Sequence, residues 1–366
     1  MKINGLKRDM NIAPRKLLIV NIFGIGDVLF TTPIINNLKA FFPDLKLGYL
    51  CNRRTEEMLK RNKKLDKIHV YERDEFKALY KRSKPAYFLM IKDFIKELKE
   101  QGYDTAIDVS LNTFTSFLVW FIGVKNRYVI NYKNRSFPLN NRIDIDGYEE
   151  KHVIEYYLDL LRVLDIPVLT KGIDIGINEQ DLSWAEEFFK RNSLLQKKLV
   201  VGIVPGGGAS WGKDAIYKRW PLEKYAKLAD NLIENYGAEI ILMGDKNEVG
   251  LCSSIAKLMR NKVFSACGDT TLFQFGALAR RCNFCVLNDG GPLHVAVAAG
   301  ARVVSVFGPV EEKVYGPYPA GHHLVVAKDI PCRPCYHRFK RASCEHVSCL
   351  KMLEAQEVLE RIKKIL

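Results

Sequence analysis

The chain has 366 residues, of which 48% are hydrophobic and 27% charged, so it is long enough for two α/β domains and too apolar for a disordered chain. The formal net charge of +14 predicts an anionic partner, either nucleic acid, a phosphorylated substrate or a lipid surface, unless the charge serves solubility alone. No apolar run reaches the ~18 residues of a membrane span, and residues 1–15 lack the apolar core of a secretory signal, so we expect a cytosolic protein with its nine cysteines as thiols.

The first strong strand signal is followed by a loop with a carboxylate. Residues 16–22, KLLIVNI, form an apolar run typical of a buried parallel strand. In the next loop, Gly24 and Gly26 fit the first two positions of a dinucleotide fingerprint, but Leu29 stands where the third glycine is required. Asp27 would also repel a pyrophosphate. It stands at a strand end, where a general base or a sugar ligand belongs, and a helix N-cap is the alternative role.

The rest of the first half alternates between helices and strands. We expect strands at residues 45–50, 103–109 and 127–131 and helices at residues 28–41, 88–101, 114–124 and 151–164. Residues 53–84 are rich in Lys and Arg with aromatic residues between them, which indicates either a solvated helical face or a surface that meets an anion. A basic loop is expected at residues 133–142. His152, at a helix start, is interpreted as structural, with a ligand-facing role as the alternative.

A shift in composition at residues 165–181 separates this half from a second α/β series. We expect strands at residues 198–204, 238–243, 263–266, 283–287 and 302–307 and helices at residues 182–192, 222–236, 252–260, 272–281 and after Pro292. This alternation is typical of a doubly wound domain of the nucleotide-binding type.

Three loops of the second half follow strands and are expected to meet at one edge of the sheet. They contain Gly206 and Ser210 with Lys218 and Arg219 close behind, then Glu248, then Asp289, Gly290 and Gly291. Glycine turns at helix starts offer backbone donors to phosphate, the two cations would neutralise charge, and an acidic side chain can bind ribose hydroxyls. Together the loops predict a nucleoside diphosphate site. Taken singly, each is also compatible with an ordinary turn, and the cations with surface charge.

At this point a resemblance to a known family becomes specific. The matching segments are Gly26-Asp27 with Thr31, Thr32 and Pro33; Tyr103-Asp104 with Ile107-Asp108; Pro205-Gly206 with Ala209, Ser210 and Trp211; Lys218-Arg219-Trp220-Pro221; Asn288-Asp289 with Gly291-Pro292, His294 and Ala296; and Val306-Phe307-Gly308-Pro309. They run in order from about residue 16 to residue 360. In these segments the chain resembles the glycosyltransferase family 9 heptosyltransferases, which transfer heptose from ADP-heptose to the inner core of lipopolysaccharide.

The resemblance implies an α/β fold of the GT-B class, with two Rossmann-like doubly wound domains facing across a cleft. Residues 1–170 would bind the acceptor and residues 171–350 the nucleotide sugar, and the helix within residues 351–366 would pack back toward the first domain. The implied partners are ADP-heptose and an acceptor of the lipid A–Kdo type at the inner membrane surface, with no nucleic acid. The protein would be cytoplasmic, with peripheral contact to the inner face of the membrane, and would need neither metal nor cofactor.

The resemblance also implies roles for individual residues. Asp27 would be the general base, with Gly26 and Thr31 on the acceptor side, in a single inverting displacement. Lys218 would stabilise the departing diphosphate, a case of electrostatic stabilisation of developing charge. The remaining donor contacts would come from Gly206, Ser210, Arg219, Glu248 at the ribose, Asp289 at the sugar, and the Gly290 and Gly291 amides at the phosphates.

Two features depart from the family pattern or stand outside it. Gly290 replaces a serine that is common in the family, so a hydroxyl donor is lost while the backbone donors remain. The loop over residues 212–216 is long, which leaves the phosphate contacts there open. Near the C-terminus, cysteines recur at a spacing that resembles a zinc site, with reduced thiols or an occasional disulfide as the alternative; these are Cys332, Cys335, Cys344 and Cys349.

Two other functions remain as alternatives. The first keeps the fold and changes the nucleotide sugar or the acceptor, for a surface polysaccharide, because donor identity depends on few contacts. The second is a non-catalytic protein that binds an anionic surface, which the charge alone would favour. It leaves Asp27 and the three loops unexplained.

Overall fold

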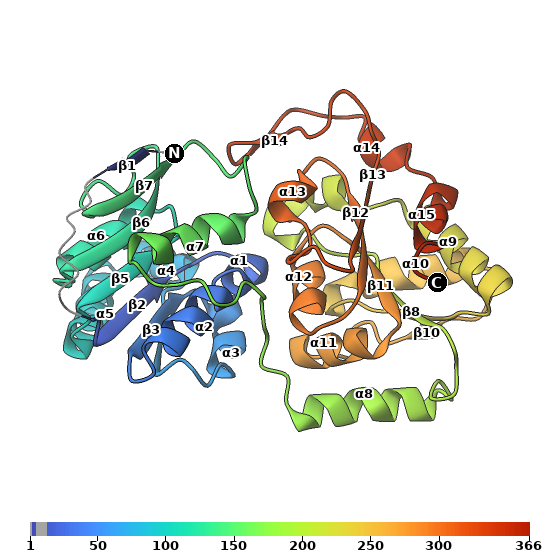
Figure 1. The fold of residues 1–366 in the computed structure, drawn as a ribbon, viewed down its shortest axis with the longest axis horizontal. Coiled ribbons are helices and arrows are strands. Elements are labelled where there is room, and N and C mark those ends of the chain that lie inside the picture. Colours follow the sequence, from blue (N-terminus) through green and yellow to red (C-terminus); the bar gives the residue numbers. More distant parts are fainter. Residues whose placement is uncertain (1, 5–12) are drawn as a thin grey trace. The chain divides into compact units, whose positions relative to one another are not determined.

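The computed structural model describes residues 2–4 and 13–366 (Figure 1). They form two compact units, one ending at Lys171 and the other running from Gly172 to Leu366. Each unit is a mainly parallel sheet with helices on both faces. No helix among the described residues is both long enough and apolar enough to span a bilayer.

The described part of the first unit contains a seven-stranded sheet in the order β1-β7-β6-β5-β2-β3-β4, parallel except for the pairing of β1 with β7. Its strands are β1 (Lys2–Asn4), β2 (Lys16–Val20), β3 (Lys46–Cys51), β4 (Lys67–Val70), β5 (Thr105–Asp108), β6 (Asn126–Tyr132) and β7 (Asn141–Ile145). Its helices are α1 (Ile25–Leu29), α2 (Thr32–Phe41), α3 (Arg53–Lys60), α4 (Arg73–Arg82), α5 (Lys84–Gln101), α6 (Thr113–Phe121) and α7 (Val153–Val163).

The chain winds outward from β2 in both directions, so right-handed crossovers place the helices on opposite faces of the sheet. One core lies between the sheet and the layer formed by α5 and α6, and includes Val20, Leu98 and Leu118. On the other face, α2 packs on α7. The C-terminal ends of β2 and β5, which are neighbours, therefore lie at one edge of the sheet.

The sequence missed some elements of this unit and merged two others. The strand β4 lies within the stretch that was interpreted as a charged surface, and β7 begins at the end of the expected basic loop and continues beyond it. Both are short strands with polar residues among the apolar ones, which give a weak apolar signal. The helix expected at residues 28–41 is divided into α1 and α2. The division has a local cause, since the hydroxyls of Thr31 and Thr32 donate to the carbonyls of Val28 and Leu29 and Pro33 has no N–H to continue the first helix.

The second unit contains a six-stranded parallel sheet in the order β10-β9-β8-β11-β12-β13 and a small antiparallel hairpin, β14 with β15. Its strands are β8 (Val200–Val204), β9 (Glu239–Leu242), β10 (Phe264–Ser265), β11 (Phe284–Asn288), β12 (Val303–Phe307), β13 (Leu324–Ala327), β14 (Tyr336–His337) and β15 (Lys340–Arg341). Its helices are α8 (Glu179–Arg191), the 3-10 segment η1 (Ala209–Lys218), α9 (Leu222–Tyr236), η2 (Lys246–Glu248), α10 (Val249–Leu258), α11 (Leu272–Arg281), α12 (Gly291–Ala298), α13 (Glu312–Tyr315), α14 (Ser348–Lys351) and α15 (Ala355–Ile362).

The last helix requires a correction. We expected it to pack back toward the first unit, but the apolar face of α15, with Val358, Leu359 and Ile362 buried, belongs to the core that α9 and α10 form on the second sheet. Helix α15 also contacts β13 (Figure 1). Burial of this face drives the helix onto the second unit, because each buried aliphatic side chain contributes about 1.5–3 kcal/mol.

Candidate functional site

The three predicted loops of the second unit lie at the C-terminal edge of its sheet. They follow β8, β9 and β11, which are neighbouring parallel strands, with β8 in the middle. In doubly wound sheets this edge, where the chain winds in opposite directions from adjacent strands, is the usual ligand site.

Glu248 ties two of these loops together. Its side chain is almost completely buried and accepts hydrogen bonds from the amide of Gly207, at 2.7 Å, and from the amide of Asp245, at 3.1 Å. The carboxylate lies so close to Gly206 that a Cβ there would stand 1.8 Å from Oε1. Position 206 therefore needs glycine because of Glu248. The Arg219 Nε donates to the carbonyl of Gly207 at 3.1 Å on the same loop.

Asn288 fixes the third loop to the first, a role that the sequence did not reveal. Its Nδ2 donates to the carbonyls of Pro205 and Gly206, at 2.8 and 3.0 Å. Its Oδ1 accepts from the amide of Trp220 at 3.0 Å and from the hydroxyl of Tyr225 at 2.9 Å. The only sequence signal was an asparagine at a strand end beside Asp289.

Lys218 and Asp289 form an ion pair at the centre of this edge. The Lys218 Nζ lies 2.6 Å from Asp289 Oδ2, and the exposed fractions of the two side chains are 10% and 4%. The ammonium also lies 4.4 Å from the ring centroid of Trp211. Both groups are therefore held in place before any substrate arrives, and an incoming anion can exchange with the Asp289 carboxylate as the partner of Lys218.

The start of α12 approaches the glycine loop very closely. Gly290 has φ 153°, and a Cβ on it would lie 2.8 Å from the Gly208 nitrogen. The first N–H groups of a helix have no carbonyl partner inside the helix, so Gly290 and Gly291 present the helix N-terminus beside the glycine loop. That the two glycines bind a phosphate stays a prediction.

The long loop with Ser210 is the segment η1, and it bends at Gly212, where φ is 59°. Ser210 is exposed. The hairpin β14–β15 holds this segment from outside: the ring centroid of Tyr336 lies 5.2 Å from that of Trp211, and Arg341 lies 3.6 Å from the carboxylate of Asp214. Sequence gave no sign that this hairpin, more than a hundred residues later, contacts the loop.

Asp27 lies in the first turn of α1, directly after β2. The N-cap residue of α1 is Gly24, so the alternative role of Asp27 as the helix N-cap is wrong. The loop is held by two buried amides. Asn21 donates to the Asp27 carbonyl at 3.0 Å, and Asn52 donates to the carbonyls of Ile22 and Phe23. These contacts hold the main chain of the loop at the strand end.

Buried tyrosines surround Asp27, and one of them engages Thr31. Burial, and more weakly the charge of Asp27, raises the pKa of Tyr49, Tyr148 and Tyr157. The Thr31 hydroxyl bonds that of Tyr49 at 2.8 Å, and Thr31 is 0% exposed. We therefore reassign Thr31 from the expected acceptor side to a structural role. Gly26 lies half-buried within α1 beside Asp27.

A second carboxyl, Asp108, lies at the same edge as Asp27, at the end of β5. It is completely buried and accepts from the amide of Ser110 at 2.8 Å and from the hydroxyls of Ser116 and Thr115 at 3.2 and 3.4 Å. Burial outweighs these donors and raises the pKa of Asp108 to about 6. His152 is structural as interpreted: its Nδ1 caps α7 by accepting from the amide of Ile154.

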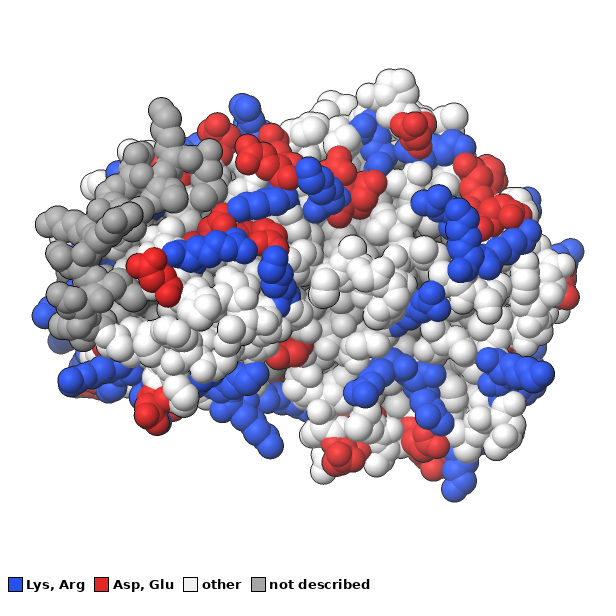
Figure 2. Space-filling model, viewed as in Figure 1, with Lys and Arg blue, Asp and Glu red and all other residues white. Residues whose placement is uncertain are grey.

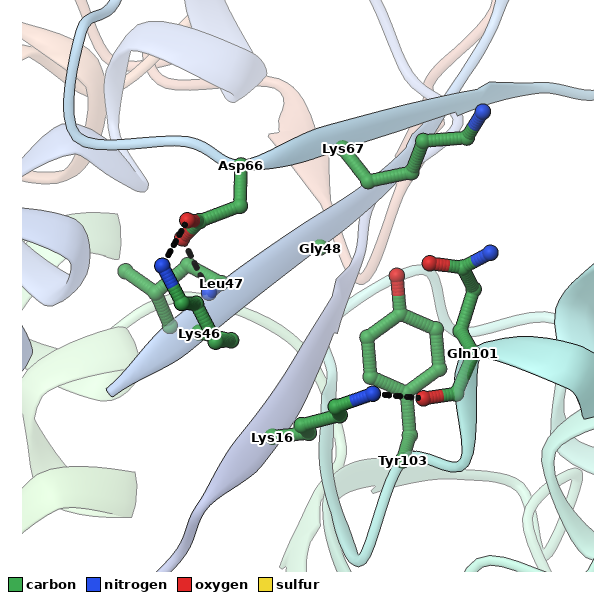
Figure 3. A pocket seen from close by; sticks show the side chains of 8 residues that line it. All are labelled: Lys16, Lys46, Leu47, Gly48, Asp66, Lys67, Gln101 and Tyr103. Carbon is green, nitrogen blue, oxygen red and sulfur yellow. Dashed lines mark hydrogen bonds and ion pairs between the residues drawn. The ribbon is translucent and has the colours of Figure 1, made fainter. Parts of the chain in front are cut away.

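A pocket of about 290 Å³ in the first unit lies at the other edge of the sheet (Figure 3). Its residues begin or precede the strands β2, β3, β4 and β5, whereas Asp27 and Asp108 follow strand ends. Figure 3 shows that Asp66 faces Lys46 and the amide of Leu47, to which it is bonded, and that Lys16 donates to Gln101. Several polar groups of this pocket are thus already bonded within the protein, and we place the candidate site at the opposite edge.

The C-terminal cysteines differ in burial. Cys332 is exposed, Cys335 and Cys344 are half-buried and Cys349 is buried, which raises the pKa of Cys349 to about 11. Among residues 2–4 and 13–366, no three His, Cys, Asp or Glu side chains gather as a metal ion would require. Cys282 and Cys285 are core residues beside β11, as interpreted. The positive charge is scattered over both units on the face that Figure 2 shows.

Comparisons with known proteins connect this chain to one family. The model described as glycosyltransferase family 9 (heptosyltransferase) matches residues 91–346. Lipooligosaccharide heptosyltransferase 2 of Campylobacter jejuni is 28% identical over 244 residues, which cover 65% of this chain and 70% of that protein.

Two solved structures show the same fold. The glycosyl transferase family 9 protein of Veillonella parvula has a TM-score of 0.76 at 21% identity and covers 96% of this chain and 97% of its own. The ADP-heptose lipopolysaccharide heptosyltransferase II of Escherichia coli has a TM-score of 0.71 at 21% identity, with coverage of 96% and 98%. The two α/β units thus form a GT-B fold.

Proposed function

The chain belongs to glycosyltransferase family 9, the heptosyltransferases, and from this premise we propose that it transfers heptose from ADP-heptose to the inner core of lipopolysaccharide. The observation that carries the proposal is the set of three loops at the C-terminal edge of the second sheet. Side chains bond these loops to one another, and the nearly buried pair of Lys218 and Asp289 lies at their centre. Relatives named as lipooligosaccharide heptosyltransferase and as ADP-heptose lipopolysaccharide heptosyltransferase support the choice of donor and acceptor.

We propose that the second unit binds the ADP part of the donor. The diphosphate would lie against the amides of Gly290 and Gly291 and pair with Lys218, which supplies a fixed positive charge where negative charge develops on the leaving group. Asp289, no longer paired with Lys218, would accept hydrogen bonds from hydroxyls of the sugar. Glu248 would bind the ribose with its carboxylate edge while still holding the amides of Gly207 and Asp245.

Asp27 would act as the general base on the acceptor. It takes the proton of the acceptor hydroxyl as that oxygen forms a bond to the anomeric carbon, and the bond from this carbon to the ADP oxygen breaks on the opposite face. The proton ends on Asp27 and the electron pair on ADP, so the configuration at the anomeric carbon inverts in one step. A carboxylate suits this task when its pKa is close to the working pH.

The acceptor would be a lipid-anchored Kdo or heptose unit at the cytoplasmic side of the inner membrane. Its carboxylates and phosphates are negative, which agrees with the net charge of +14. Peripheral contact with that membrane is part of the proposal, because the reacting hydroxyl belongs to a molecule that stays in the bilayer.

A donor screen tests the proposal. Purified protein is incubated with ADP-heptose, and separately with UDP- and GDP-sugars, and with a Kdo–lipid A acceptor, and product is followed by mass spectrometry. We expect transfer from ADP-heptose with inversion at the anomeric carbon. Transfer from another nucleotide sugar in preference would replace the donor assignment, and no transfer from any sugar together with no binding of ADP would refute an enzymatic role at this edge.

A further inference from the structure

Helix α6 turns large apolar side chains both inward and outward. The inner face, with Leu118 and Val119, is buried in the core against the sheet. The outer face carries Phe114, Phe117, Trp120 and Phe121, whose exposed fractions are 36%, 39%, 50% and 54%. A surface helix of a globular protein normally turns polar residues outward, so a helix that exposes several large aromatic side chains indicates a further apolar partner.

A fifth ring extends this surface. Phe137, in the loop between β6 and β7, is 57% exposed, and its ring centroid lies 5.2 Å from that of Phe117. The centroid of Phe117 lies 6.4 Å from that of Trp120. We call this set the aromatic surface: Phe114, Phe117, Trp120, Phe121 and Phe137. It joins segments on either side of β6, so it is a feature of the folded unit and not of one peptide.

The segment that carries the aromatic surface is basic. Residues 109–143 contain five cations and no Asp or Glu. Among these cations Lys125, Lys133 and Arg135 are exposed. From the neighbouring helix α5, the Lys99 ammonium lies 4.5 Å from the ring centroid of Phe121. Exposed Phe and Trp side chains beside Lys and Arg are the composition of segments that lie in a membrane interface, with rings at the headgroup level and cations on the phosphates.

We propose that the aromatic surface docks on an anionic lipid bilayer, with its rings in the interface and the flanking cations on lipid phosphates. The inference rests on the proposed function in one respect, that the acceptor is anchored in a bilayer. It adds the surface that would bring the protein there. Helix α6 begins just after the C-terminal end of β5, beside the end of β2 that leads to Asp27. A first unit docked through α6 would therefore hold its acceptor edge close to the headgroups.

Vesicle binding tests this surface without donor or acceptor. The full chain is sedimented with vesicles of phosphatidylcholine that contain 30% phosphatidylglycerol, and with pure phosphatidylcholine. We expect the anionic vesicles to bind the protein at least about tenfold more strongly, since each Lys or Arg near such a surface contributes about 1 kcal/mol. After Phe121, Trp120 is the most exposed ring on α6. Its fluorescence should shift to the blue on binding, because the ring leaves water for the membrane interface.

Two sets of variants separate the rings from the charges. F117S with F121S keeps Trp120 as the reporter and should weaken binding about tenfold, through loss of apolar area. K125E and K133E should each weaken binding about fivefold or more in the anionic vesicles. The matched controls are L258S and K257E on α10, where Leu258 is 53% exposed in the second unit, and these should bind as the original chain does.

The outcomes decide between this inference and its rivals. The docking surface is refuted if F117S/F121S binds anionic vesicles as strongly as the original chain does. It is also refuted if the original chain binds both vesicle types equally. Self-association that F117S/F121S abolishes in sedimentation velocity would assign the surface to a second copy of the chain. Turnover on a soluble, deacylated acceptor should be unchanged in these variants. If that turnover is absent in the original chain while anionic vesicles still bind, the proposed function fails and the docking surface stands.

Discussion

The two candidate edges of this protein are held together by different kinds of contacts. In the second unit, charged side chains act together with the neutral amide of Asn288 to tie the three loops to one another: Glu248 bonds two backbone amides, Arg219 bonds a backbone carbonyl and Lys218 pairs with Asp289. In the first unit, neutral amides of Asn21 and Asn52 hold the loop of Asp27 by its main chain and by that of its neighbours.

This difference suits the two tasks that we assign to the edges. A diphosphate is best met by charges that are already positioned, because their reorganisation then costs little when negative charge develops. A general base must change its own charge during the reaction, so the loop that carries it should not depend on its carboxylate for stability. In the first unit, Asn21 contributes to this by bonding the main-chain carbonyl of Asp27.

The largest expected effect is that of Asp27→Ala. Because the loop is bonded through main-chain atoms, the variant should fold normally and bind ADP with unchanged affinity, while transfer falls about a thousandfold or more, the usual size for loss of a positioned base. Steady-state kinetics and calorimetric titration with ADP measure the two effects.

Asp44→Ala, which removes an exposed acid from the same unit, is the matched control and should keep full turnover. If Asp27→Ala also kept its turnover, the base would have to be another group, and Asp108 would be the next to test.

Lys218→Ala should lower both transfer and ADP affinity. Removal of the ammonium leaves Asp289 buried without its cation and takes away the charge that meets the diphosphate. We expect kcat to fall about a hundredfold or more and ADP affinity to fall with it. Lys227→Ala on the exposed side of α9 is the control. A variant with normal ADP affinity and normal kcat would remove Lys218 from the donor site.

Gly206→Ala tests the brace made by Glu248. The new Cβ would stand 1.8 Å from the Glu248 carboxylate, so that side chain must move and release the amide of Gly207. We expect a loss of about 1–3 kcal/mol in the free energy of unfolding, measured by urea denaturation, together with weaker ADP binding.

Gly250→Ala is the matched control, since a Cβ at this position in α10 meets no atom within 4 Å. It should stabilise the protein slightly, because alanine is a better helix former than glycine. Equal stability of the two variants would show that Glu248 does not constrain position 206.

The contacts between these loops also show which features the sequence could not predict. Apolar runs were enough to predict β8, β11 and β12, and glycines at their ends were enough to predict the loops, because both signals are local. The contacts of Asn288 with Pro205 and Gly206 depend on which strands are neighbours, and this is set by the whole sheet. The same holds for the hairpin at Tyr336 that packs on η1, since nothing near Trp211 in the sequence indicates it.

The smallest expected effect concerns the buried carboxyl of the first unit. The pKa of Asp108 is about 6 in the folded chain because of burial, against about 3.9 in an unfolded one. The folded state therefore binds more protons between these two values, so the contribution of this group to stability is fully present below pH 4 and is lost as the pH rises through 6. Between pH 5 and pH 7 the loss should be about 1 kcal/mol.

Asp108→Asn isolates this term, because its amide oxygen can still accept from the Ser110 amide and its amide nitrogen can donate to the Ser116 hydroxyl oxygen, but the side chain does not ionise. Urea denaturation at pH 5 and pH 7 should show that the original chain loses about 1 kcal/mol more than the variant over this interval. Asp44→Asn, at an exposed position, should follow the original chain. If Asp108→Asn lost as much stability as the original chain between pH 5 and pH 7, the Asp108 carboxyl would be ionised throughout this interval. The side chain at the end of β5 would then be charged, unlike the neutral amides of Asn21 and Asn52.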